Sequence, residues 1–218
     1  MRIEWLGHSS FLLTALDGTR IITDPYVPGS FSGQLRYGPI REQAHAVTVS
    51  HHHRDHDGVA KLPGEPALCD RAGSYKEGSI GISGFDTFHD ESKGSERGHN
   101  VVFVFAADGL RVCHCGDLGH VLKAHQVAAI GKVDVLLLPV GGTFTIDATT
   151  AHEVADQLVA RIVIPMHYKT EKLGFDIDGV EAFTQGEKNV KRIGRSEVEV
   201  SAEKLPQAQE IWVLEHAL

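Results

Sequence analysis

The segment VSHHHRDHDG, from Val49 to Gly58, holds four histidines and two aspartates in ten residues. Side chains of these types are costly to bury unless they are paired or bind a metal ion. Its histidines follow AHAVTVS, a β-branched run that predicts a buried strand, and they lie inside the chain rather than at a terminus. A solvated, histidine-rich loop is the alternative. The position after a buried strand favours a metal site, because zinc-type ions take nitrogen and oxygen ligands.

The spacing inside this segment separates ligand candidates from a bystander. His51 and His53 are two residues apart, and such residues point to the same side of an extended chain. Both imidazoles can therefore reach one ion. Asp55 and His56 follow where the chain turns, so they can reach a second ion beside the first. His52 is expected to point away from both ions.

The segment SHHHRDHDG matches the H-x-H-x-D-H motif of the metallo-β-lactamase superfamily. TFHD, CHCGD and IPMH follow in the order in which that family places its later ligands, and IEWLGHSSFLL and IITDP are also similar. The chain thus resembles the single-domain metal-dependent hydrolase branch, which includes lactonases acting on sugar-acid phosphates. The resemblance implies an α/β fold, namely a four-layer α/β/β/α sandwich of two mixed sheets covered by helices. One domain over residues 1–218 is expected.

The resemblance also implies a binuclear ligand set. It places two divalent metal ions at one edge of the sandwich, with zinc expected and manganese or iron as alternatives. The first metal would be held by His51, His53 and His89, the second by Asp55, His56 and His167, and Asp117 would bridge them. For the position of His89, His99 and His114 are alternatives.

Five further residues are candidates for the pocket. The resemblance places His8 and Asp24 near the metals, where they would orient ligands, although both could serve only as turn residues. Thr143, in the loop GGTFTID, could contact an anionic substrate at a helix N-terminus, or the loop could be a simple cap. Tyr168 and Lys169 follow the last ligand and could reach a substrate carboxylate or phosphate.

The ligand set predicts a metal-dependent hydrolase. Two ions about 3.5–4 Å apart can share a water and lower its pKa, and the resulting hydroxide attacks an ester, lactone or phosphoester. Asp55 or an adjacent water would move protons. A phosphodiesterase or nuclease of the same fold is one alternative. A di-iron oxidoreductase is another, but such relatives have a glutamate in the place of the second histidine, where this chain has His53.

Composition limits the partners of this chain. Its formal net charge is −8 and its pI about 5.9, so a broad surface for nucleic acid is not expected. No apolar stretch approaches the roughly 20 residues of a membrane helix, and no signal peptide is evident. Three cysteines, an odd number, favour a reducing compartment such as the cytoplasm. The expected partner is therefore a small-molecule substrate, which could be an anion.

Turn and periodicity signals predict several elements. Asp17-Gly18 and Asp108-Gly109 each lie between apolar runs and predict hairpins. VDVLLLPVGG predicts a strand that is buried on both faces. The two final strands, in SEVEVSAEKLPQAQEIWVLE, are expected at sheet edges. Helices are predicted over residues 118–131, 147–160 and 178–190, with Asp147 and Asp178 as N-caps of the last two.

Overall fold

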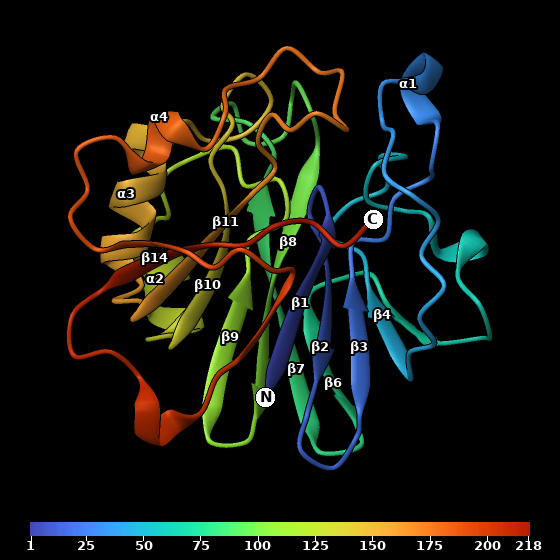
Figure 1. Ribbon diagram of the computed structural model, residues 1–218, viewed down its shortest axis with the longest axis horizontal. Coiled ribbons are helices and arrows are strands. Elements are labelled where there is room, and N and C mark those ends of the chain that lie inside the picture. The colour runs from blue at the N-terminus through green and yellow to red at the C-terminus, as the bar shows by residue number, and fades with distance from the viewer.

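Two mixed β-sheets pack face to face in the computed structural model, which describes residues 1–218 (Figure 1). The pair of mixed sheets expected from the sequence is therefore confirmed. The ring of Phe11 in the smaller sheet lies 6.2 Å from that of His114 in the larger sheet. Both side chains belong to the interior between the sheets, so the main hydrophobic core fixes how the two sheets meet.

The smaller sheet has six strands, and three of them end at the same edge. In spatial order the strands are β13 (Glu197–Glu199), β1 (Arg2–Gly7), β2 (Ser10–Thr14), β3 (Arg20–Thr23), β4 (Ala46–Thr48) and β5 (Ala67–Cys69). β1, β2 and β3 pair antiparallel, whereas β4 pairs in parallel with both β3 and β5. The ends of β1, β3 and β4 therefore lie at the same edge.

The larger sheet has eight strands. In spatial order they are β12 (Val190–Arg192), β14 (Glu210–Val213), β11 (Ile162–Met166), β10 (Val135–Pro139), β9 (Leu110–His114), β8 (His99–Ala107), β7 (Ile80–Phe88) and β6 (Gly73–Glu77). β6 to β9 pair antiparallel, and the strands from β9 to β12 pair in parallel. Every residue of β10 is buried, as expected for a strand covered on both faces.

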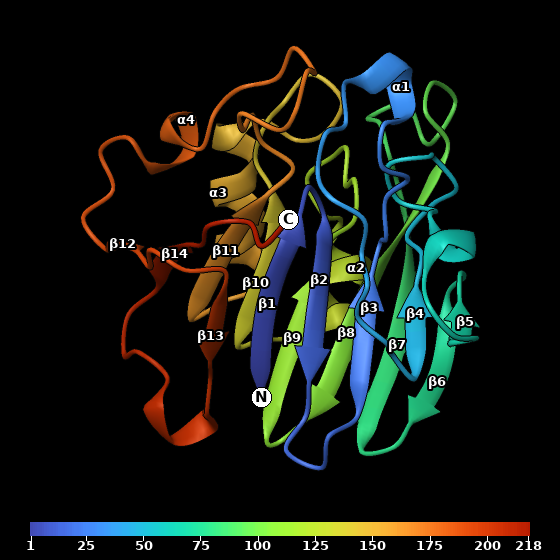
Figure 2. The same cartoon turned by 45° about the vertical axis from the view of Figure 1, so that its right-hand side comes forward.

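The outer faces of the two sheets have different covers. Helices α2 (Ala124–Ile130), α3 (Ala148–Gln157) and α4 (Glu181–Thr184) lie on the side of the larger sheet (Figures 1 and 2). The smaller sheet is covered instead by residues 25–44 and 173–177, whose apolar side chains form a second core cluster with those of the sheet. The only α-helical element in that cover is the single turn α1 (Ser30–Gly33).

Both predicted hairpins are confirmed. β2 and β3 are joined through Asp17-Gly18, and β8 and β9 through Asp108-Gly109. Asp108 and Gly109 have φ values of 56° and 72°. Both residues of this two-residue loop thus adopt the left-handed conformation that such tight hairpins require.

The helix predictions are only partly correct. Asp147 caps α3, since its Oδ1 accepts a hydrogen bond from the amide of Thr150 at 2.8 Å. The helix expected from residue 118 begins only at Ala124, so the placement of His120 on a helix was wrong. Asp178 does not cap α4, because its amide donates to Gly141 and its carbonyl accepts from Lys169 in a connection between loops.

The chain end also differs in part from the expectation. β13 is an edge strand, as expected, but β14 lies between β11 and β12 and is therefore internal. The short strand β12 forms that edge of the larger sheet because it pairs in parallel with β14. No helix of the structure has the length and apolar character needed to span a membrane.

Candidate metal centre

The polar cluster lies where strands of both sheets end. His8 follows β1, Asp24 follows β3, and the segment from His51 to His56 follows β4. From the larger sheet, His89 follows β7, Asp117 comes shortly after β9, and His167 follows β11. Loops at a common edge of a rigid scaffold can hold side chains from distant parts of the sequence in one place. All seven predicted ligands are brought to this edge.

One group consists of His51, His53 and His89, whose ring nitrogens lie within 4.8 Å of one another. Nε2 of His51 is 3.0 Å from Nδ1 of His53. The two alternatives to His89 lie elsewhere: His99 is exposed at the start of β8, and Nε2 of His114 is 2.8 Å from the carbonyl oxygen of Ser9. The structure therefore brings His89, not its rivals, to the predicted trio.

A second group contains His8, Asp55, His56 and His167, again with ligand atoms within 4.8 Å of one another. Three of them are the residues predicted for the second metal. The fourth, His8, has its Nε2 3.2 Å from Oδ2 of Asp55. His8 therefore lies among the ligand atoms themselves, and not only behind them as the sequence predicted.

Asp117 lies at the centre of the cluster. Its Oδ2 is 3.2 Å from Nε2 of His56, 3.2 Å from Nε2 of His89 and 3.3 Å from Nε2 of His167. Nε2 of His51 is 3.8 Å away. One carboxylate oxygen thus faces histidines of both groups, which is the position expected for a residue that bridges two ions.

Several ligand atoms of the cluster are buried and lack a hydrogen-bond partner. These include Oδ1 of Asp55 and Oδ1 of Asp117. Buried polar atoms are normally satisfied, so a local concentration of unsatisfied ones points to a missing partner. Nitrogen and carboxylate oxygen donors in this number suit divalent transition metals. The residues therefore fit the metal centre that the sequence predicts.

Electrostatics favours the protonation states that metal ligands need. Burial lowers the pKa of His51 to about 3 and that of His8 to about 4. Burial opposes ionisation of Asp117, but His167 and His56 outweigh it and hold the pKa of that carboxyl well below its usual value. Neutral imidazoles and charged carboxylates are the forms that bind metal.

His56 differs from the other histidines of the cluster. Burial disfavours its charged form, yet the carboxylates of Asp117 and Asp55 outweigh burial and raise the pKa of His56 well above its usual value. A proton on this imidazole offsets the negative charge that gathers around it. A divalent cation bound in the cluster would provide the same compensation.

Asp24 supports the cluster from behind. It is fully buried, and it accepts hydrogen bonds from the amide and hydroxyl of Ser50 and lies 2.8 Å from Nδ1 of His56. These contacts fix the ring of His56 and the start of the histidine segment. Asp24, His8 and His167 all have positive φ, at 38°, 52° and 50°. Such conformations cost about 1–3 kcal/mol each and cluster at functional sites.

His52 points away from the cluster, as its place between two ligands predicts. Its side chain is 62% exposed, and Nδ1 lies 2.9 Å from Oδ2 of Asp57. The run of three adjacent histidines therefore contains two members of the cluster and one surface residue.

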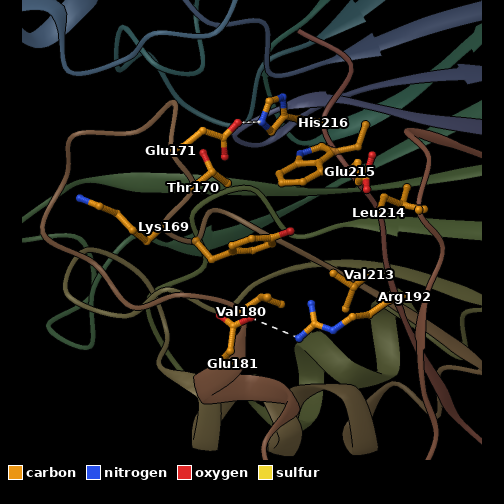
Figure 3. A pocket seen from close by; sticks show the side chains of 13 residues that line it. Lys169, Thr170, Glu171, Val180, Glu181, Arg192, Val213, Leu214, Glu215 and His216 are labelled. Atoms are coloured by element: carbon orange, nitrogen blue, oxygen red, sulfur yellow. Dashed lines mark hydrogen bonds and ion pairs between the residues drawn. The ribbon is translucent and has the colours of Figure 1, made fainter.

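The predicted substrate contacts at Thr143, Tyr168 and Lys169 do not line the cavity above the cluster. The ring of Tyr168 packs 5.2 Å from that of Trp5 and, with Lys169, lines a separate pocket (Figure 3). Thr143 is exposed, and its carbonyl oxygen accepts a hydrogen bond from Arg97. The chain turns sharply at His167, so the residues that follow this histidine face another side of the molecule.

A cavity of about 660 Å³ opens above the cluster. Asp55, Asp117 and three histidines of the cluster form part of its lining, and aromatic and arginine residues form much of the rest. The sequence analysis did not identify these aromatic and arginine residues, which are Phe31, Arg54, Arg97, Phe144 and Phe175. Phe31 and Phe144 occur in glycine-rich stretches that predict loops, which was the only available signal for them.

Comparisons with known proteins point to one superfamily. The family described as "Beta-lactamase superfamily domain" matches residues 2–167. A UPF0173 metal-dependent hydrolase of Methanoregula boonei is 30% identical, over 82% of this chain and 87% of that protein. Another, from Archaeoglobus fulgidus, is 27% identical over 78% and 84%. A crystal structure of a candidate Zn-dependent hydrolase of the metallo-β-lactamase superfamily from Thermotoga maritima has 40% identity, 98% coverage of both chains and a TM-score of 0.80.

Proposed function

The chain belongs to the β-lactamase superfamily, and on this premise we propose that it is a metal-dependent hydrolase of small-molecule substrates with a binuclear centre. Its substrate bond would be an ester, lactone or phosphoester. The observation that carries the proposal is the position of Asp117, whose Oδ2 lies within 3.3 Å of Nε2 of His56, His89 and His167.

The candidate ligands divide into two sets. His51, His53 and His89 would hold one ion, and Asp55, His56 and His167 the other, with Asp117 shared. Zinc suits this donor set best, and manganese or iron are alternatives. When bound, such ions supply Lewis acidity and lower the pKa of water toward neutrality.

Two carboxylates assist from within the protein. Asp55 lines the cavity beside the other ligands, so we assign to its carboxylate the movement of protons during the reaction. Asp24 holds Nδ1 of His56 and so directs Nε2 of that ring toward Asp117.

The three cysteines are unpaired and buried, which supports a reducing compartment such as the cytoplasm.

Metal analysis followed by a hydrolysis screen tests the proposal. The protein is reconstituted separately with zinc, manganese and iron, and each form is assayed with lactones, carboxylic esters, phosphodiesters and single-stranded nucleic acid. We expect about two metal equivalents per chain and chelator-sensitive hydrolysis of a small ester, lactone or phosphoester. Absence of bound metal after reconstitution would contradict the proposal. Cleavage of nucleic acid alone would favour a nuclease, and oxygen consumption by a di-iron form a redox enzyme.

A further inference from the structure

Three phenylalanines form one side of the cavity above the metal centre. The ring of Phe175 lies 5.2 Å from that of Phe31 and 6.0 Å from that of Phe144, both in edge-to-face contact. Phe31 is 41% exposed and Phe144 is 39% exposed, and neither belongs to the main core. Exposed aromatic side chains gathered at one cavity mark a binding surface, because burial by a ligand stabilises them.

The turn that carries Phe31 is strained. Gly29, Phe31, Ser32 and Gly33 all have positive φ, and the values for Phe31 and Ser32 are 53° and 56°. Non-glycine residues pay about 1–2 kcal/mol for this conformation. α1, which contains this turn, lies at the same end of the molecule as the loops that follow β10 and β11 (Figure 2). The strained turn holds the aromatic side chain of Phe31 against Phe175 instead of in the protein core.

Two arginines, Arg54 and Arg97, also line the cavity. Its only acidic residues are Asp55 and Asp117, which belong to the metal centre. Arg97 lies with its guanidinium carbon 5.9 Å from the centroid of the Phe144 ring, and it donates a hydrogen bond to the carbonyl of Thr143. A cation therefore sits directly beside the aromatic surface. On a chain with a formal net charge of −8, this local positive charge favours an anionic ligand.

The loop that carries Arg97 is held in place by Asp90. This carboxylate accepts hydrogen bonds from the amides of Ser92, Gly94, Glu96 and Arg97 at 2.8–3.0 Å. Arg97 is thus fixed at its backbone by Asp90, and its guanidinium donates to the carbonyl of Thr143 and forms an exposed ion pair with Glu96, whose Oε2 lies 3.8 Å from Nη1. A positioned arginine loses less freedom on pairing with a carboxylate or phosphate than a mobile one does.

From these contacts we infer that the substrate is an amphiphilic anion, with an aryl or similarly bulky apolar group and a carboxylate or phosphate. The apolar group lies against Phe31, Phe144 and Phe175, and the anion pairs with Arg97. This inference rests on the proposed function, because it takes the cavity above the metal centre as the substrate site. Arg54 adds positive charge at the same cavity and raises the local concentration of anions.

Three matched ligands test the inference by direct binding. Isothermal titration calorimetry compares 3-phenylpropionate, propionate and 3-phenylpropanol, on the metal-loaded protein and again after chelation. We expect 3-phenylpropionate to bind at least about tenfold more tightly than either ligand that lacks one of its two groups. The preference should persist after chelation, since the arginine and the phenylalanines do not require metal.

Variants separate the two contacts. Arg97→Gln should weaken 3-phenylpropionate roughly threefold to tenfold, because the pair is partly exposed, and should leave 3-phenylpropanol unchanged. Phe144→Ala should weaken both phenyl ligands about tenfold and leave propionate unchanged, and Phe31→Ala provides a second test of the aromatic surface. Arg195→Gln and Leu16→Ala, exposed substitutions outside the cavity lining, are matched controls and should bind as the parent protein does.

The outcomes distinguish this inference from the proposed function. Equal affinity for all three ligands, or equal weakening by the control variants, would overturn the inference even if the protein hydrolyses small esters. Preferential binding of 3-phenylpropionate by a protein that hydrolyses nothing would uphold the inference and count against the hydrolase. Preference that disappears on chelation would assign the anion to the metal ions instead of Arg97, and would also overturn it.

Discussion

Nδ1 of His56 lies 2.8 Å from Oδ2 of Asp24, and Nε2 on the other side of the same ring lies 3.2 Å from Asp117. A buried carboxylate thus sets the orientation of a central histidine. Such outer partners raise the basicity of a ligating histidine and fix its ring, and their loss typically weakens metal binding 10–100-fold.

Asp24→Ala should therefore weaken metal affinity about 10–100-fold. It should also lower the free energy of unfolding by about 1–3 kcal/mol, because Ser50 and His56 lose a buried partner. Competition with a chelator of known affinity measures the first effect, and denaturant unfolding the second. Asp24→Asn is the milder control, since the amide oxygen can still accept from His56. Unchanged metal affinity in the alanine variant would show that His56 does not depend on this contact.

Asp117→Asn should leave a folded protein that binds at least one fewer metal ion and loses most turnover. The neutral amide removes the negative charge that faces His56, His89 and His167. Asp117 does not cap the helix that follows it, because that helix, α2, begins only at Ala124. Elemental analysis and thermal melting of this variant are the measurements. Full metal occupancy with normal activity would contradict a bridging role.

His52→Ala should retain metal content and activity, whereas His51→Ala and His53→Ala should lose both. The reason is orientation, since His52 is 62% exposed and pairs with Asp57 while its neighbours face the cluster. The three variants change the same residue type within three positions, so each is a control for the others. Elemental analysis measures the metal content of each variant. An equal loss of metal in all three would show that the segment is not oriented in this way.

Asp90→Ala should loosen the loop over residues 90–98 and weaken the binding of an anionic ligand at Arg97. Burial opposes ionisation of Asp90, but backbone amides led by that of Arg97 outweigh it and lower the pKa of the carboxyl to about 2. Its folded-state pKa is thus below the unfolded value near 3.9, so its stabilisation is complete above that pH and is lost as the pH falls toward 2.

Hydrogen exchange of the loop amides measures this effect. Exchange at Ser92, Gly94, Glu96 and Arg97 should be faster in Asp90→Ala than in the parent protein at neutral pH, and the parent should approach the variant as the pH falls toward 2 after correction for intrinsic rates. Asp17→Ala, which removes another turn carboxylate far from the cavity, is the control. Unchanged protection in the Asp90 variant would mean that other contacts hold the loop.

The sequence alone was sufficient for features that depend on short spacing or on a recognised motif. The i, i+2 relation of His51 and His53 predicted that both face one side and that His52 does not, because side-chain direction alternates along an extended chain. Asp108-Gly109 predicted its hairpin because few residues accept two successive left-handed conformations. The two-sheet architecture followed from the family resemblance of the H-x-H-x-D-H segment.

Only the tertiary structure decided which distant residues meet. The family resemblance favoured His89 and left His99 and His114 as alternatives, and the choice among them depends on which strand ends reach the edge where the sheets join. The contact of Asp24 with His56 and the approach of Phe31 to Phe175 depend in the same way on strand order and loop path. Tyr168 and Lys169 failed as predicted contacts for the converse reason: adjacency to a ligand in sequence does not fix direction when the backbone turns at φ 50°.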